Sequence, residues 1–483
     1  MNLEFIRPVI KYLPEVRLPK RHVPFKEKLI WTSVILALFF VMGNVYPIGV
    51  SKVDLPLSYQ QFQMIFASTM GSIISIGIGP IVTSSIVLQL LVGAKMIDID
   101  LATTEGKALF QGTQKILTII IALFEAVAVV VGFRLGEKFL MGQGIEWSLS
   151  HPMVTAAIFQ IAVGSILLMY MDEIVSKWGI GSGIGLFIVA GVSTSIITGS
   201  LSILKWIDPS LGTLGRIPDF INIAMNTGEI DLILLFPVIA TIIVFLVVVF
   251  GESMRLEIPL SYGGIRGVGG RYPLKFFYVS NIPVILAAAL LANVQMLPGL
   301  VGVTDMYSPP LDMNPLQQGV MTLVRYVTLG ELGGSGNNPG ILNPANIGQL
   351  IGPNGPDILL HLLIYLLVFL LLCILFGKFW VETTGLGAEK VADQIQQGGM
   401  QIPGFRRDKR VVEKVLNRYI PQITIISSMA VGLLAVGADL LGAIGSGTGI
   451  LLTVGILYRL YEEVQKEQMA DMHPAFRRFM GKS

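Results

Sequence analysis

The apolar residues of this 483-residue chain are gathered into long runs that are separated by short polar segments. A membrane-spanning helix needs about 20 mainly apolar residues. By this measure we expect ten spans, at about 29–47, 72–93, 108–133, 152–171, 184–203, 231–251, 276–297, 357–379, 422–442 and 448–464. The fifth, ninth and tenth runs are rich in Gly, Ser and Thr, which is typical of spans that lie inside a bundle, away from lipid.

The stretch 57–93 departs most from a plain span. Its first part, 58–71, places three glutamines among apolar residues, which favours a short helix that does not face lipid. Its second part carries Gly77, Gly79 and Pro80 where an ordinary span has Leu. A short half-inserted helix followed by a kinked, Gly-lined span indicates a water-accessible path through the membrane.

The composition excludes an ordinary soluble protein and most enzyme classes. Hydrophobic residues make up 53% of the chain and charged residues 14%, against about 25% charged in soluble domains. The single cysteine excludes a disulfide framework. The basic leader 1–28 predicts no cleavable signal peptide, and its apolar face suits a helix on the membrane surface. Phosphate-loop, zinc and nucleophile-elbow motifs are missing, so we expect no enzyme activity, no cofactor and no metal.

The distribution of charge predicts the orientation of the spans. An even number of spans puts both termini on one side of the membrane, and 28 of the 34 Lys and Arg residues fall on that side. Loops rich in Lys and Arg stay in the cytoplasm. Both termini are therefore expected to be cytoplasmic.

Two cytoplasmic loops, 252–275 and 380–421, hold many of these basic residues. The charges either fix topology alone or form a docking surface for a large acidic partner such as ribosomal RNA or an acidic protein. The length of the second loop and its tight basic cluster favour docking. The candidate residues are Arg255, Arg266, Arg271, Lys275, Arg406, Arg407, Lys409 and Arg410. The long external loop 298–356 carries no recognisable chemistry.

Two short matches relate the halves of the chain at an offset of five spans. The sequence GSGIGLFI at 181–188 is echoed by GSGTGILL at 445–452, and Gly79–Val82 is echoed by Ile282–Ile285. An odd offset reverses the direction of each span, so this pattern predicts an inverted-topology repeat. In such folds the functional path lies between the halves, near mid-membrane.

The repeat also selects a set of aliphatic residues. It pairs Val82 with Ile285 and Ile188 with Leu452, and Ile78 and Ile184 add one more turn. Any one of these residues alone is more often ordinary packing. As a set at pseudo-symmetric positions they predict a hydrophobic constriction, which gates by excluding water.

Ionisable groups are scarce within the expected spans. Glu125 is the clearest case, and Thr83, Gln89 and Asn281 could join it in a small polar cluster. Such a cluster serves either as a proton relay or as a hydrogen-bonded clasp between helices that must part; a lone carboxylate without a basic partner favours the clasp. The same scarcity argues against the alternative function, a secondary transporter of small solutes built on an inverted repeat.

Four long motifs, GIGPIVTSSIVLQLL, DEIVSKWGIGSGIGLFI, YPLKFFYVSNIPVILAAAL and GSGTGILLTVGILYRLYE, resemble the SecY family, the protein-conducting channel subunit of the Sec translocon. The likeness covers essentially the whole chain and is nearest to the archaeal members, which are also similar to the alpha subunit of the eukaryotic translocon. The resemblance implies an all-α multi-pass membrane protein, with ten transmembrane helices in two inverted five-helix halves. These halves would form a clamshell, hinged between the fifth and sixth spans and opening laterally between the second and seventh.

The resemblance also implies a division of the chain and a set of roles. The segments would be a leader 1–28, an N-terminal half 29–205 with the plug 58–71, an external hinge 206–230, a C-terminal half 231–464 and a tail 465–483. The pore ring would comprise Ile78, Val82, Ile184, Ile188, Ile285 and Leu452. The plug would present Tyr59, Phe62, Ile65, Phe66 and Met70, and the polar cluster of the lateral gate would be Thr83, Glu125 and Asn281.

The implied partners are a SecE-type subunit and a small beta or SecG-type subunit in a heterotrimer, the ribosome, signal sequences, nascent polypeptides and lipid, at the plasma membrane. The loop 252–275 is less basic than the resemblance leads us to expect, so ribosome contact would lean on Arg406, Arg407, Lys409 and Arg410.

Overall fold

The computed structural model is a bundle of long helices with short elements at both ends. It describes residues 7–21, 23–50, 63, 66–93, 96–97, 99, 103–203, 214–228, 230–262, 269–279, 281–295, 297–301, 303, 313–335, 338–397, 400–401 and 409–472. The first part of the chain forms α1 (Arg7–Ile10), α2 (Phe25–Gly43), α4 (Gly79–Gly93), α5 (Thr104–Gly132), α6 (Glu137–Gly142), α7 (Pro152–Trp178), α8 (Gly183–Leu201) and α10 (Arg216–Thr227).

The second part of the chain contains the remaining helices and all the described strands. Its elements are η2 (Leu232–Leu235), α11 (Phe236–Ser253), β1 (Arg255–Tyr262), β2 (Gly269–Lys275), α12 (Ile282–Val294), α13 (Leu297–Leu300), α14 (Pro315–Val327), η3 (Gly330–Gly333), β3 (Gly334–Ser335), β4 (Asn338–Pro339), α15 (Ile347–Ile351), α16 (Gly355–Thr384), α17 (Ala388–Gln397), β5 (Met400–Gln401), α18 (Lys409–Leu440) and α19 (Gly447–Met472).

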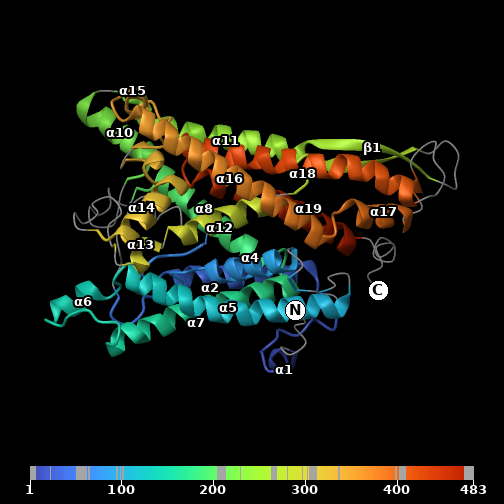
Figure 1. Cartoon of the computed structure of the whole chain (residues 1–483), viewed down its shortest axis with the longest axis horizontal. Coiled ribbons are helices and arrows are strands. Elements are labelled where there is room, and N and C mark those ends of the chain that lie inside the picture. Colours follow the sequence, from blue (N-terminus) through green and yellow to red (C-terminus); the bar gives the residue numbers. More distant parts are fainter. Residues whose placement is uncertain are drawn as a thin grey trace.

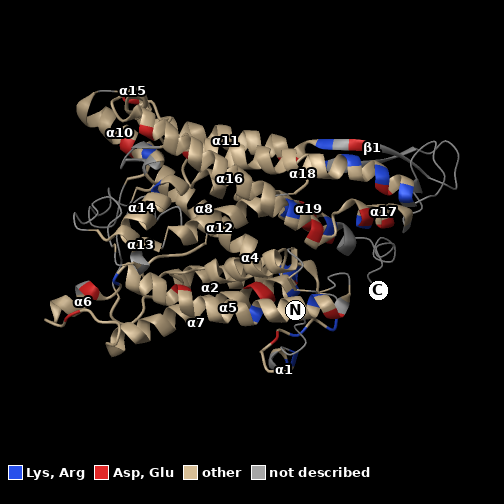
Figure 2. Cartoon of the chain, viewed as in Figure 1, with Lys and Arg blue, Asp and Glu red and all other residues tan. Residues whose placement is uncertain are grey.

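The long helices run side by side, and the two ends of the bundle differ in character. Helices α6, α10, α14 and α15 lie at one end, while β1 and α17 lie at the other (Figure 1). The helix bodies are largely free of charge, and Lys and Arg gather toward the end that holds β1 and α17 (Figure 2). This separation is the one that the count of Lys and Arg predicts for cytoplasmic and external ends.

Each of the ten expected spans contains a helix. Six helices in the described part of the chain are long and apolar enough to cross a membrane, judged by length and composition alone. Helices α4 and α12 are apolar but shorter. Helices α2 and α19 occupy the first and tenth expected spans and carry charged residues toward one end.

Local sequence signals account for several helix boundaries. The Thr103 hydroxyl accepts a hydrogen bond from the Gly106 backbone N–H at 3.0 Å and so caps the start of α5. Helix α7 begins with Pro152, whose missing N–H costs nothing in the first turn. Helix α16 ends at Thr384, and Gly385 directly after it adopts a left-handed conformation.

The second expected span is shorter than predicted. We expected helix over 72–93, but the helix begins only at Gly79, and residues 72–78 form consecutive turns. Gly77 has φ +53°, outside the helical region, and the Ser72 hydroxyl donates to the Thr69 carbonyl at 2.6 Å. A positive φ and a hydroxyl that competes for backbone groups both interrupt a helix.

The two expected cytoplasmic loops contain strands and a helix in their described residues. Strand β1 pairs antiparallel with β2, and β5 pairs with the far end of β1, so the sheet order is β2-β1-β5. Beside this sheet, α17 and the first turns of α18 enclose a separate apolar cluster that includes Val391, Ile395, Val412 and Leu416. The described parts of the expected loop, 380–397, 400–401 and 409–421, therefore form a small packed unit rather than a tether.

Two groups of helices meet along a seam. The N-terminal group (α2, α4, α5, α7, α8) contacts the C-terminal group (α11, α12, α16, α18, α19) through α4 against α12 and α16, and through α8 against α19. In the contact between α8 and α19, a glycine of each helix faces an aliphatic side chain of the other. A Cβ placed on Gly185 would lie 3.1 Å from Ile456, and one placed on Gly449 would lie 3.0 Å from Val192. The repeat aligns Gly185 with Gly449, and the same register aligns Val192 with Ile456, so the contact follows the predicted pseudo-symmetry.

We expect Gly447→Ala to lower the midpoint of thermal unfolding of the detergent-solubilised protein. The added Cβ would lie 2.2 Å from the Ala435 backbone oxygen, and overpacking of this kind costs about 1–3 kcal/mol. The matched control is Gly437→Ala, where a Cβ meets nothing within 4 Å and alanine favours the helix. Equal unfolding midpoints for the two variants would contradict the close approach of α19 to α18.

Candidate functional site

The six aliphatic residues expected to form a constriction lie in one continuous cluster of buried apolar side chains, although they come from distant parts of the chain. Four are buried and two are partly buried against them: Ile78, Val82, Ile188 and Leu452, and Ile184 and Ile285 respectively. We call these six residues the collar. Their segments are the turn before α4, α4 itself, α8, α12 and α19. That the collar lines a pore stays a prediction.

The turns before α4 are tightly packed beside the collar. The Ile78 backbone N–H donates to the Phe66 carbonyl at 2.8 Å, and the Ser165 hydroxyl donates to the Gly77 carbonyl at 2.8 Å. Phe66 and Met70, two of the expected plug residues, are buried with 0% and 3% exposure. The other expected plug residues, Tyr59, Phe62 and Ile65, lie outside the described residues.

A chain of hydrogen bonds crosses the seam between α5, α4 and α12. The Thr83 hydroxyl donates to Glu125 Oε1 at 2.9 Å, and the Asn293 amide donates to the Thr83 hydroxyl at 2.9 Å. Glu125 is buried, with 5% of its surface exposed. The chain links one helix of the C-terminal group to two helices of the N-terminal group.

Asn281 does not belong to this chain, which corrects the expected cluster. Its amide donates to the Leu451 carbonyl at 2.9 Å and packs against Gly455, so it faces α19. From Asn281 to Asn293 a helix turns about 120° beyond three full turns, so the two amides meet different neighbours. Asn293 was missed, although it is the only polar side chain in the apolar stretch 282–294 and could have been chosen on that ground.

The seam also contains a cleft of about 440 Å³ near the end that holds α17. The N-terminal group contributes Gln89, Lys107 and Phe110 to its wall; the C-terminal group contributes Trp380, Thr383, Thr384, Gly385, Lys390 and Gln394. Beside it, a Cβ on Gly93 would lie 2.4 Å from the Phe379 ring, so α4 and α16 touch closely here. The two groups are thus in contact along α4 but leave an opening at this end.

The expected docking residues fall into three sets. Arg255 and Lys275 flank the base of the β1–β2 hairpin and both pair with Glu462 of α19, at 3.5 and 3.2 Å. These two residues therefore hold the hairpin in place as well as contributing charge. Arg410 is exposed on the first turn of α18. The structure does not describe the side chains of Arg266, Arg271, Arg406, Arg407 and Lys409.

Long apolar helices packed in two groups, six of them in the described residues long and apolar enough to cross a membrane, define a multi-pass membrane protein. The SecY family model matches residues 72–461. Protein translocase subunit SecY of Methanocaldococcus jannaschii is 43% identical over 98% of this chain and 99% of that protein. The protein of the same name from Pyrococcus horikoshii is 44% identical over 97% of each. The chain belongs to the SecY family.

Solved structures agree with this assignment. One described as the structure of a protein conducting channel superposes with a TM-score of 0.78 at 41% identity, over 97% of this chain and 99% of that one. Sec61 in the canine ribosome-channel complex from the endoplasmic reticulum superposes with a TM-score of 0.75 at 40% identity, over 97% and 99%. The expected fold class, a multi-pass helical protein of the SecY type, is confirmed.

We expect Asn293→Ala to loosen the contact between α4 and α12. Losing one hydrogen bond of about 1 kcal/mol raises the population of a parted state about fivefold. Double electron–electron resonance between spin labels on α4 and α12 would show the change as added long distances. Asn281→Ala is the matched control, since that amide faces α19. If Asn281→Ala broadens the distances as much as Asn293→Ala does, the assignment of Asn293 is wrong.

Proposed function

We propose that this protein is the central channel subunit of a Sec protein translocase, which passes secretory polypeptides across the membrane and releases transmembrane segments sideways into lipid. The observation that carries the proposal is the burial of the six collar residues, which come from distant segments, in or against one cluster of apolar side chains. The solved structures with the same fold as this chain include one described as a protein conducting channel.

The collar supplies the physical property that such a channel needs. Small ions cannot shed their water in a narrow aliphatic constriction, so a closed collar excludes them. Aliphatic side chains can change rotamer around a polypeptide in transit and close again behind it. We infer that Ile78, Val82, Ile184, Ile188, Ile285 and Leu452 form this ring.

The segment 58–71 would be the plug that covers the collar from the external side. The burial of Phe66 and Met70 against the same cluster supports this role. A related structure, 40% identical with a TM-score of 0.76, is described as showing that the plug domain of the SecY protein stabilises the closed state and maintains a membrane seal.

The lateral gate would lie between α4 and α12. Thr83, Glu125 and Asn293 hold it as a clasp, because hydrogen bonds can be exchanged for others when an apolar segment enters. The cleft between α4, α5, α16 and α17 presents Phe110 and Trp380 among polar side chains at the proposed cytoplasmic end, and we infer that signal sequences approach the gate there.

The surroundings of the channel follow from the same assignment. We infer a plasma-membrane location with both termini cytoplasmic, a hinge within 206–230 that includes α10, and a heterotrimer with a SecE-type and a small beta or SecG-type subunit. Ribosomes would dock on the hairpin and on the unit built from α17 and α18. A relative 40% identical to this chain is described within a ribosome-channel complex. The energy for movement would come from such a partner.

The decisive experiment widens the collar. We expect Val82→Gly and Ile188→Gly each to increase ion conductance through the reconstituted complex in planar bilayers, because each removes an aliphatic side chain from a constriction that works by excluding water. Ile242→Gly on α11 is the matched control, since it makes the same exchange at a side chain that is 55% exposed. Unchanged conductance in both collar variants would refute the ring.

Docking can be tested separately. Replacing Arg406, Arg407, Lys409 and Arg410 with Ala should weaken ribosome binding in a cosedimentation assay, by roughly tenfold or more near 0.1 M salt. The parent's affinity should fall steeply as salt rises, and the variant's affinity should fall less steeply. Arg134→Ala, at the α6 end of the bundle, should leave binding unchanged. Equal affinity of parent and quadruple variant would exclude this cluster as the ribosome contact.

A further inference from the structure

Two carboxylates hold the starts of α8 and α19, the helices that pack reciprocally through glycine. Asp172, near the end of α7, accepts a hydrogen bond at Oδ1 from the Ile184 backbone N–H at 2.9 Å. Asp439, near the end of α18, accepts one at Oδ1 from the Gly447 backbone N–H at 2.6 Å. In both cases the donor belongs to the first turn of a helix, where N–H groups have no partner within the helix itself.

The turns before α8 and α19 place the first residue of each helix close to the aspartate that it contacts. Gly181 has φ +73° and Gly445 has φ +90°, at positions that the repeat aligns. A Cβ on Gly183 would lie 2.6 Å from Asp172 Cα, and one on Gly447 would lie 2.6 Å from Asp439 N. Gly183 and Gly447 are aligned by the repeat as well, so both halves require glycine where the helix start meets the acid.

The acids themselves are not aligned. Helix α7 continues to Trp178, well past Asp172, whereas α18 ends at Leu440, directly after Asp439. The two halves therefore reach the same contact from different positions on the preceding helix. Because the two acids do not occupy aligned positions, duplication of one half cannot explain both contacts. The hydrogen bond itself is therefore the shared feature.

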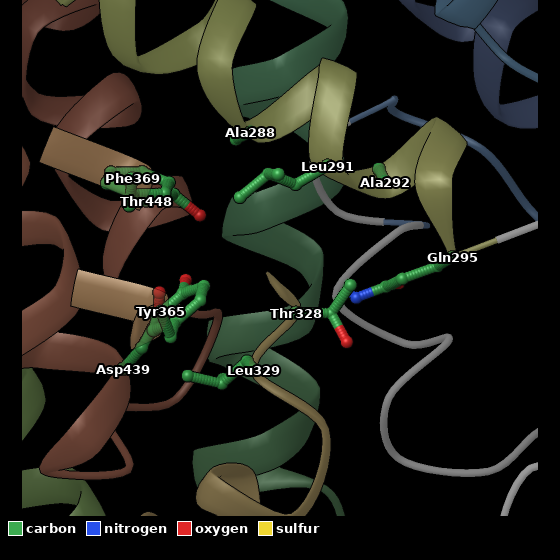
Figure 3. A pocket seen from close by; sticks show the side chains of 10 residues that line it. All are labelled: Ala288, Leu291, Ala292, Gln295, Thr328, Leu329, Tyr365, Phe369, Asp439 and Thr448. Atoms are coloured by element: carbon green, nitrogen blue, oxygen red, sulfur yellow. The ribbon is translucent and has the colours of Figure 1, made fainter. Parts of the chain in front are cut away.

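The surroundings of Asp439 show why its hydrogen bond matters energetically. Asp439 is 7% exposed and lies beside Tyr365 at a cavity of about 30 Å³ that Thr448 also lines (Figure 3). Among the described residues, those that line the cavity include no Lys or Arg. The carboxylate is therefore stabilised mainly by the N–H that it accepts and by the partial positive charge at the start of α19.

Three collar residues lie within the first two turns of α8 and α19. Ile184 is itself the residue whose N–H is held by Asp172, and Ile188 is one turn further along α8. Leu452 is likewise little more than one turn beyond Gly447. Each residue advances a helix by about 100°, so a slip of one residue at the start would turn the collar side chain away from the path.

We propose that Asp172 and Asp439 are positioning residues that set the rotation and depth of α8 and α19 and so keep the closed collar tight to ions. This inference rests on the proposed channel function. It assigns the seal to two groups that are not themselves collar residues, one at the start of each of the two helices.

The test compares alanine with asparagine at each position in the reconstituted heterotrimeric complex. We expect Asp172→Ala and Asp439→Ala each to raise the ion conductance of the idle channel in planar bilayers about tenfold, the change that loss of one charge-assisted hydrogen bond allows. Asp172→Asn and Asp439→Asn keep an oxygen acceptor and should restore conductance to within about twofold of the parent. Asp231→Ala is the matched control. Asp231 caps η2 through the Ile233 N–H at 3.0 Å, and neither η2 nor α11, which follows it, carries a collar residue.

Each outcome bears on the inference. Parental conductance in both alanine variants, with unchanged yield of folded complex, would overturn it, and so would asparagine variants that leak as much as the alanine variants. If an alanine variant does not fold, the asparagine variant and Asp→Ser at the same position take its place, with serine expected to leak more than asparagine. Val82→Gly measured in parallel separates the two proposals: if it leaks while the alanine variants do not, only the positioning role fails.

Discussion

The close approach of α8 to α19 through glycine is the contact on which the rest of the structure depends. Gly185 and Gly449 let the two backbones come near enough for Ile456 and Val192 to fill the space, in a pair of equivalent contacts. Inside a membrane the hydrophobic effect does not hold helices together, so packing of this quality does. The opposite side of the seam is different, because α4 and α12 are linked through the Asn293–Thr83 hydrogen bond. In the proposed channel, the α8–α19 contact would stay closed, and the hydrogen bonds between α4 and α12 could be exchanged for others.

Irregular backbone beside the collar is possible only because its polar groups are satisfied within the protein. Backbone N–H and C=O groups at membrane depth cost several kcal/mol when they lack partners. The turns before α4 meet this demand with the Ile78–Phe66 hydrogen bond and with the Ser165 hydroxyl on the Gly77 carbonyl. These partners lie on α7 and on the segment 66–78 itself, so the turns are supported independently of the C-terminal group.

Much of this arrangement could be predicted from the sequence, because apolar length and glycine spacing are local signals. The helices within the ten expected spans and the paired glycines of α8 and α19 followed from such signals, whereas the collar as a ring around a path stays a prediction. The helix over 72–78 was wrongly expected, since an apolar run does not reveal the positive φ of Gly77. Asn281 was placed in the gate and Asn293 was overlooked, because the rotation of α12 against its neighbours depends on packing and not on composition. The β-hairpin could not be predicted from hydropathy, which reads a polar segment as loop.

The two ion pairs at the base of the hairpin have a mechanical consequence. Arg255 and Lys275 both grip Glu462, and α19 runs without interruption from Gly447 to Met472. Glu462 and Leu452 are therefore points on one stiff rod, roughly 15 Å apart at 1.5 Å per residue. If a partner docks on the hairpin as we propose, any displacement of the hairpin would move α19 and with it Leu452, so that docking would shift the collar directly.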